Sequence, residues 1–142
     1  MTTTRLIGLR NSFLIIWQAS MKHKMYCIFA MEAVQKMSGV RGKMCTQAGH
    51  AYLHTFLQAT KEFPQLAEDY LNSAHAFKIT LIVDTVDQLK AIQEAYKTVC
   101  ATKLITDKGF TVFTEPTTTC LGLGPLPETM IGDDLKVLKT FT

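Results

Sequence analysis

Four polar residues have the spacing of one side of a helix: Lys43, Gln47, His50 and His54. Steps of four, three and four residues place their side chains almost in line. Lys43 would lie in the first turn, where its charge opposes the helix dipole and where free backbone N–H groups attract anions. The pattern therefore predicts an anion-binding site, and the alternative is an ordinary solvated face.

The histidine pair does not predict a metal site. His50 and His54 have the i, i+4 spacing that can chelate a metal, but no Glu follows His50 as it does in the H-E-x-x-H pattern. The sequence offers no evident third ligand. We therefore expect neither a metal nor another cofactor.

A second polar group follows an apolar run further along the chain. Asp107-Lys-Gly-Phe-Thr111 comes directly after an expected strand, and a long connection then leads to Thr117-Thr118-Thr119. Loops of this length between neighbouring strands are often binding loops. Asp and Thr are also normal turn residues, so plain turn chemistry is the alternative.

A glycine-containing strand comes next. Leu121-Gly-Leu-Gly-Pro125 places glycines inside an apolar run, which predicts that another backbone approaches closely. The segment is not a G-x-G-x-x-G fingerprint and it ends in proline, so it does not predict dinucleotide binding. The sequence also shows no Ser/His/Asp order, nucleophile elbow or phosphate-binding P-loop.

Apolar periodicity supplies the elements that must position these residues. Residues 25–31 form a continuous apolar run, typical of a strand buried on both faces. The expected order is a strand at 25–31, a polar loop at 35–42, helices at 43–62 and 64–71, a strand at 77–83, a helix from a capping box at Thr85 to Val99, strands at 101–106 and 119–123, and a short terminal helix from Pro127. Strands separated by helices predict an α/β domain with a mainly parallel sheet, which binds ligands beyond the carboxyl ends of its strands.

Composition indicates one ordinary domain. The chain has 142 residues, of which 47% are hydrophobic and 19% charged, so it can fill a core. No apolar run is long enough to span a membrane as a helix. The cysteines at 27, 45, 100 and 120 form no C-x-x-C pair, which predicts reduced, mostly buried thiols in a reducing compartment.

The basic charge is concentrated at the N-terminus. Residues 1–24 hold four bases and no acid, whereas residues 25–142 hold 11 bases and 12 acids. The net charge of +3 is therefore no sign of nucleic-acid binding by the domain. We expect an extension over 1–24 outside the core and a cytoplasmic domain over 25–142. A targeting or surface helix and ordinary ordered structure are alternatives for 1–24.

Two motifs carry a family resemblance. Gly42-Lys-Met-Cys-Thr-Gln-Ala-Gly-His50 fits a G-K-x-x-x-Q-x-x-H pattern, and Asp107-Lys-Gly-Phe-Thr111, with Thr119 and Gly124-Pro125, fits a second pattern that begins D-x-G-x-T. Together they resemble the type II peptidyl-tRNA hydrolase family, from about residue 24 to the C-terminus. The resemblance implies a three-layer α/β/α sandwich with a four-stranded mixed sheet, mainly parallel by the order above. It also implies hydrolysis of the ester that joins a peptide or N-blocked amino acid to the 3′ ribose of tRNA, which recycles tRNA for translation.

The resemblance also implies a catalytic set: Lys43, Gln47, Asp107, Thr111 and Thr119. In our hypothesis Asp107 orients the attacking water and Lys43, and Lys43 stabilises the oxyanion or a phosphate. Gln47 would hold the ester carbonyl or the terminal ribose, and the two threonines would hydrogen-bond substrate or water. Asp107 is not expected to be a strong general base, because an aspartate has a low pKa that a nearby lysine lowers further.

Further residues are expected to bind the substrate: His50, Arg41, Lys36 and Phe110. No acid lies between Glu32 and Glu62, so the bases of this window form a candidate tRNA footprint: Lys36, Arg41, Lys43 and Lys61. Phe110 stands where the family often has arginine, and it would either stack on an unpaired base or pack on its own domain. Family members often dimerise, so a second copy of the chain is a candidate partner, and the domain is not expected to bind a membrane.

Two other functions remain open. One is a non-catalytic tRNA- or protein-binding domain of the same fold, and the other is a hydrolase for a different ester or amide. The chain departs from the family pattern at Lys108, Phe110 and Val112, and Glu115-Pro116 replaces a Pro-Gly pair. These changes affect RNA contacts more than ester chemistry, because all five central side chains are present.

Overall fold

The computed structural model describes residues 21–37 and 40–142. The chain contains, in order, β1 (His23–Ala30), α2 (Met31–Lys36), α3 (Arg41–Glu62), α4 (Pro64–Asn72), β2 (Ala76–Val83), α5 (Val86–Tyr96), β3 (Thr102–Asp107), β4 (Thr117–Pro127), the 3-10 turn η1 (Glu128–Met130), α6 (Asp133–Lys136) and β5 (Lys139–Thr140). Most of the extension expected over 1–24 lies outside the described residues, and β1 already begins at His23. No described helix is both long and apolar enough to cross a membrane.

The strands form one mixed sheet of five strands in the order β3-β4-β1-β2-β5. Only β1 and β2 pair in parallel; β1–β4, β3–β4 and β2–β5 are antiparallel. The prediction of four strands in a mainly parallel sheet is therefore wrong. The helix-separated strands β1, β2 and β3 do run in one direction, but β4 enters antiparallel between β1 and β3, and the two-residue β5 adds to the edge at β2.

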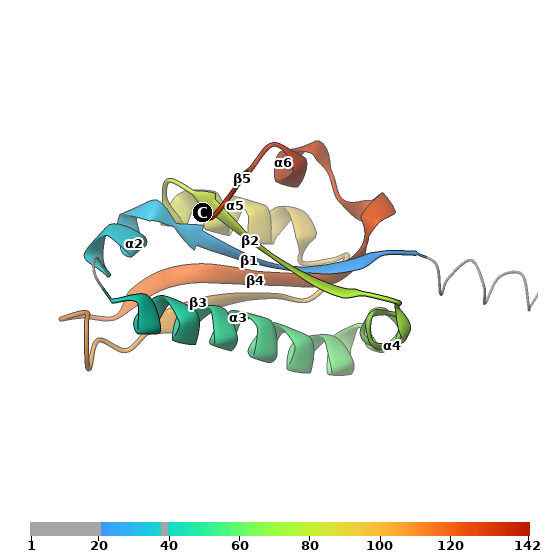
Figure 1. Cartoon of the computed structure of the whole chain (residues 1–142), viewed down its shortest axis with the longest axis horizontal. Helices are drawn as coiled ribbons and strands as arrows, with labels where there is room; N and C mark the ends of the chain where they lie inside the picture. Colours follow the sequence, from blue (N-terminus) through green and yellow to red (C-terminus); the bar gives the residue numbers. More distant parts are fainter. Residues whose placement is uncertain (1–20, 38–39) are drawn as a thin grey trace, which may run out of the picture.

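Helices cover both faces of this sheet (Figure 1). Alternate residues of β1 pack against the helices on opposite faces of the sheet. Tyr26 and Ile28 belong to the apolar cluster that contains Leu89 of α5. Phe29 belongs to the cluster that contains Ala51 of α3. The continuous apolar run over 25–31 was thus correctly interpreted as a strand buried on both faces, although it ends at Ala30.

Local signals determine where most helices begin and end. Thr85 and Gln88 form the expected capping box, in which the Thr85 hydroxyl accepts from the N–H of Gln88 and the Gln88 side chain accepts in return. Pro64 opens α4 at its first turn. The short helix α2 (Met31–Lys36) is not among the expected elements, because the sequence pattern predicts strand at residue 31 and loop from residue 35 and assigns no element to residues 32–34.

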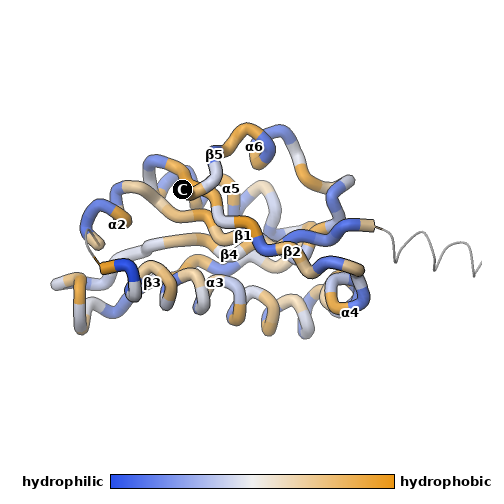
Figure 2. Tube along the Cα trace, viewed as in Figure 1, coloured by the Kyte–Doolittle hydropathy of each residue, from blue (hydrophilic) through white to orange (hydrophobic). Residues whose placement is uncertain are grey.

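The carboxyl ends of β1, β2 and β3 lie at the same end of the sheet. The chain leaves this end through α2 and returns with the first turn of α3 (Figure 1). Lys43 on α3 and Asp107 at the end of β3 therefore lie at the same end of the sheet. Hydrophobic and hydrophilic residues alternate along α3 in Figure 2, as expected of an amphipathic helix with one face on the sheet.

Helix α3 lies close on β4 because β4 has a glycine at the contact. A Cβ atom on Gly122 would overlap the Oγ1 atom of Thr55 and would lie 2.5 Å from the carbonyl oxygen of Ala51. Thr55 and Ala51 are both fully buried residues of α3. The expectation that the glycine-containing strand admits a neighbouring backbone is confirmed.

Gly122→Ala should lower the free energy of unfolding by about 1–3 kcal/mol, because helix and strand must separate to admit the methyl group. Gly49→Ala is the matched control on α3, since a Cβ there meets nothing within 4 Å, and it should stabilise the protein by about 0.5–1 kcal/mol. Urea denaturation of both variants measures the two effects. A neutral Gly122→Ala would show that this contact does not set the distance between α3 and β4.

Candidate active site

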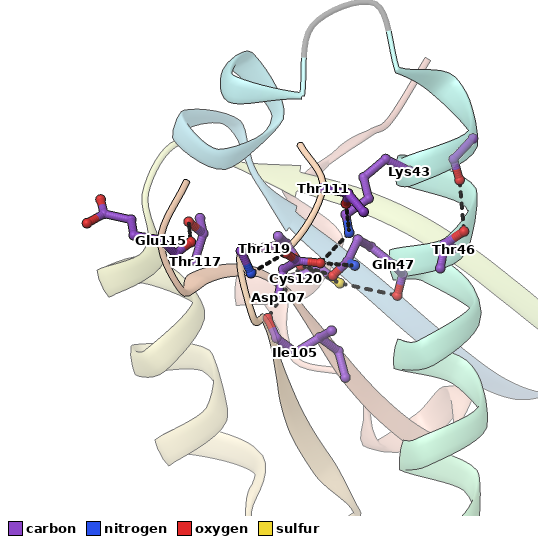
Figure 3. Close-up of polar contacts among 12 residues, drawn as sticks. Lys43, Thr46, Gln47, Ile105, Asp107, Thr111, Glu115, Thr117, Thr119 and Cys120 are labelled. Carbon is purple, nitrogen blue, oxygen red and sulfur yellow. Dashed lines mark hydrogen bonds and ion pairs between the residues drawn. The ribbon is translucent and has the colours of Figure 1, made fainter. Parts of the chain in front are cut away.

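An ion pair links the start of α3 to the end of β3. The Nζ atom of Lys43 donates to Oδ2 of Asp107 across 64 residues of sequence, and it also donates to Oγ1 of Thr111 at 3.2 Å. The side chains of Lys43 and Asp107 are only 14% and 10% exposed. The structure thus brings three residues of the predicted set together in one place (Figure 3).

The position of Lys43 explains why it needs a carboxylate. The first turn of α3 holds no acid, and its N-cap residue Val40 makes no side-chain cap. An ammonium group at this end of a helix is opposed by the helix dipole. Asp107 supplies the compensating negative charge from a separate element, so the pair also fastens α3 to β3.

The loop after β3 holds Asp107 in place. The N–H of Gly109 donates to Oδ1 of Asp107 at 2.8 Å, which leaves Oδ2 for the lysine. Gly109 has a φ of 84°, in the region that favours glycine, and a Cβ there would lie 2.7 Å from the carbonyl carbon of Glu115. This glycine therefore allows the loop to fold back and place Thr111 beside Lys43.

A β-bulge turns two neighbouring side chains of β4 towards α3. The pair Ile105–Cys120 is followed by the pair Thr106–Thr118, so β4 contains one extra residue, Thr119. Bulges re-aim side chains and are frequent beside active sites. As a result, Thr119 and Cys120 both contact the same residue of α3.

That residue is Gln47, which connects the bulge to the ion pair. Thr119 Oγ1 donates to Oε1 of Gln47 at 2.7 Å, and Nε2 of Gln47 donates to Oδ2 of Asp107 at 3.3 Å. Gln47 and Thr119 are buried, with exposures of 2% and 0%. Their groups form a hydrogen-bonded chain that ends on the carboxylate of Asp107 (Figure 3).

The surroundings lower the pKa of Asp107 below its ordinary value. The hydrogen bond from Lys43 is the largest cause, desolvation acts in the opposite direction, and the N–H of Gly109 lowers the pKa further. Asp107 is therefore a carboxylate at neutral pH. This agrees with the expectation that it is a poor general base.

Lys43, Gln47, Asp107 and Thr111 line a cleft of about 750 Å³ between α3 and β3. Thr119 does not line this cleft, although its hydroxyl donates to Gln47. His50 and His54 also line it, with their rings stacked and their centroids 5.5 Å apart. Within residues 21–37 and 40–142, no group of three or more His, Cys, Asp or Glu side chains could hold a metal ion. The cleft thus offers ammonium groups, a carboxylate, exposed hydroxyls and an amide, a set suited to an oriented water and a developing oxyanion.

The other predicted residues are more dispersed. Phe110 lines the cleft and is 86% exposed, so the alternative that it packs on its own domain is wrong. Arg41 and Lys36 are exposed and line two separate hollows, one beside the start of α3 and one beside α2 and residues 115–118. Lys61 lies 18 residues beyond Lys43 on the same helix, about 27 Å away at ~1.5 Å per residue.

Five cleft residues were missed by the sequence reasoning: Lys103, Leu104, Ile105, Thr106 and Lys108. Lys103 lines the cleft from β3, four residues before Asp107. The two-residue period of a strand places residues 103, 105 and 107 on one face, and this was the available signal. The expectation of mostly buried thiols holds for Cys27, Cys100 and Cys120, whereas Cys45 is exposed.

Fold and site together define an α/β protein with a polar cleft at the carboxyl end of an edge strand. The family model of peptidyl-tRNA hydrolase PTH2 matches residues 23–141. The chain belongs to this family, whose activity is the hydrolysis of the carboxylic ester of peptidyl-tRNA.

Relatives from archaea and a yeast agree with this assignment. A peptidyl-tRNA hydrolase of Methanopyrus kandleri is 33% identical over 102 residues, which is 70% of this chain and 87% of the relative. One from Thermoplasma volcanium is 29% identical over 94 residues, or 66% and 80% of the two chains. A probable peptidyl-tRNA hydrolase 2 of Schizosaccharomyces pombe is 32% identical over 102 residues, but the match spans only 49% of its length.

Lys43→Met should raise the pKa of Asp107 towards its ordinary value, because the largest lowering cause is lost, while desolvation still raises the pKa and the N–H of Gly109 still lowers it. A ¹³C titration of the carboxyl group measures this, with Lys90→Met on α5 as control. Because the pKa of Asp107 is lower in the folded protein than in the unfolded chain, the ion pair stabilises the protein at pH values above the unfolded-state pKa. This stabilisation is lost as the pH falls through the folded-state pKa. The difference in unfolding free energy between wild type and Lys43→Met should therefore shrink in acid, and an unchanged pKa would contradict the assigned cause.

Proposed function

We propose that Lys43, Gln47, Asp107, Thr111 and Thr119 form the active site that hydrolyses peptidyl-tRNA. The bond cleaved is the ester between a peptide or N-blocked amino acid and the 3′ ribose. The observation that carries the proposal is the shielded Lys43–Asp107 pair at the cleft, because it places a cation and a water-binding carboxylate side by side.

The charges of the pair suggest their roles. Asp107 has a lowered pKa, so it orients Lys43 and the attacking water more than it removes a proton. Lys43 stabilises the negative oxygen that forms when water adds to the ester carbonyl. Collapse of this intermediate breaks the bond to the ribose oxygen, and the water's proton passes to that leaving oxygen. The products are a carboxylic acid and a free 3′ hydroxyl.

The remaining members of the set differ in access. Thr111 is exposed and accepts from Lys43, so its hydroxyl can meet substrate. Gln47 and Thr119 are buried, and the Thr119 hydroxyl already donates to Gln47. We therefore assign these two a positioning role, which holds Asp107 in the orientation that Lys43 and the water require.

The tRNA is expected on the side of the cleft where α3 begins. Arg41 and Lys36 are exposed there and can contact phosphates, while Phe110 is free to stack on an unpaired base of the acceptor end. His50 would contact the substrate within the cleft. A homodimer, a cytoplasmic location and a domain over 25–142 stay predictions.

A non-catalytic tRNA-binding domain is the alternative function. Binding alone would not require a lysine that contacts both a carboxylate and a hydroxyl, with the ion pair largely shielded from solvent, since exposed bases suffice for phosphate contacts. The full constellation favours hydrolysis, and a direct assay separates the two functions.

Asp107→Asn should slow hydrolysis of N-acetyl-aminoacyl-tRNA by about 10²-fold or more, because it removes the charge that orients Lys43 and the water. Lys43→Ala should reduce the single-turnover rate as well as binding. The matched controls are Asp87→Asn and Lys90→Ala on α5, both exposed. Survival of the rate within threefold in both site variants would exclude the proposed roles, and binding without turnover by the wild type would support the alternative.

Thr119→Val should lower kcat with little change in KM, because Gln47 loses its donor and Asp107 its orientation. An unsatisfied buried amide oxygen should also lower the free energy of unfolding by about 1–3 kcal/mol. Thr119→Ser keeps the hydroxyl and should restore kcat. A purely structural role predicts instead that kcat stays normal wherever Thr119→Val remains folded.

A further inference from the structure

The free edge of β3 forms one wall of the active-site cleft. All residues from 103 to 108 line the cleft, including both ends, Lys103 and Lys108. Among the described strands, β3 has β4 as its single neighbour in the sheet. A ligand in the cleft therefore meets the backbone of an edge strand beside the reactive pair.

Alternation in the ladder determines which backbone groups are free. The carbonyl of Ala101 accepts from the N–H of Gly124, so this pair points towards β4. In an antiparallel ladder the next residues alternate, so Thr102, Leu104 and Thr106 direct their N–H and C=O groups away from β4. No other element in the described part of the chain bonds to that side. An unpaired edge of this kind is a template for an added strand.

We propose that this edge of β3 binds the peptide moiety of peptidyl-tRNA as an added strand, an inference that rests on the function proposed above. Strand addition draws its affinity from main-chain hydrogen bonds. Such bonds are available in a peptide of any sequence. They therefore suit substrates that share only an ester and a polypeptide backbone.

The chemistry of the ester fixes the direction of the peptide. Its C-terminal carbonyl is the ester carbonyl, so this group lies beside Asp107, at the carboxyl end of β3. The preceding residues then run back towards Lys103, and the added strand is parallel to β3. Lys103 and Asp107 are four residues apart, about 13 Å at ~3.3 Å per residue, so the edge accommodates three or four peptide residues.

The rest of the cleft agrees with a peptide more than with RNA. The apolar residues Leu104 and Ile105 line it from β3, and the stacked His50 and His54 line it from α3. The exposed bases Arg41 and Lys36 line separate hollows. Lys103, Lys108 and Phe110 are the lining residues that would suit RNA here, so an RNA occupant is one outcome of the test.

The test uses the full-length chain and substrates that differ only in the peptide. Tetrapeptidyl-tRNAs carry one backbone N-methyl group at either the second or the third residue from the ester. Because only alternate residues of an added strand bond to β3, one position should lower kcat/KM by about 3–10-fold and its neighbour should have little effect. Lengthening the peptide from one residue should lower KM until about four residues and not beyond.

The results separate this inference from the proposed function. N-acetyl-aminoacyl-tRNA barely reaches the edge, so its hydrolysis tests the active site alone, and failure there overturns both proposals. Normal hydrolysis with equal effects of N-methylation at both positions overturns strand addition only. Strand addition is also overturned if peptide length has no effect on KM and Lys103→Ala weakens inhibition by a peptide-free RNA that ends in CCA. These two results together would show that the cleft binds RNA.

Discussion

The compensation of one ammonium group is the constraint on which the site depends. Lys43 lies in the first turn of a helix whose dipole opposes its charge, and its side chain is largely removed from water. An isolated charge in that place would be strongly unfavourable, whereas a paired and hydrogen-bonded charge is tolerated. The carboxylate of Asp107 at the end of β3 compensates the charge of Lys43. The resulting ion pair therefore determines how the start of α3 packs against β3.

Every partner of Asp107 then has a defined task. One carboxylate oxygen accepts from Gly109 and the other accepts from Lys43 and Gln47. Gln47 is in turn fixed by Thr119, which a bulge in β4 directs towards it. Three elements that are distant in sequence thus converge on one carboxyl group, and loss of the Thr119 hydroxyl would leave the buried Oε1 of Gln47 without its donor.

The sequence predicted the parts of this arrangement that are encoded locally. The apolar run of β1, the capping box at Thr85 and the helical spacing of Lys43 and Gln47 each depend on neighbouring residues. The insertion of β4 between β1 and β3 depends on pairings between distant segments, and no periodicity reveals them. The sequence pattern does not reveal the extra residue of the bulge either. Sequence reasoning therefore predicted a hydrogen bond from Thr119 to substrate or water and not to Gln47.

The corrected sheet order also changes what the site can do. In the mainly parallel sheet that was expected, nothing placed β3 at an edge. Because β4 takes the place beside β1, β3 becomes an edge strand, and its unpaired backbone lies along the cleft that ends at Asp107. In our two proposals the substrate is divided at its ester, with phosphates towards Arg41 and Lys36 and the peptide along β3. Recognition on each side would then use only features that all tRNAs or all peptides share, which would allow one cleft to serve a whole class of substrates.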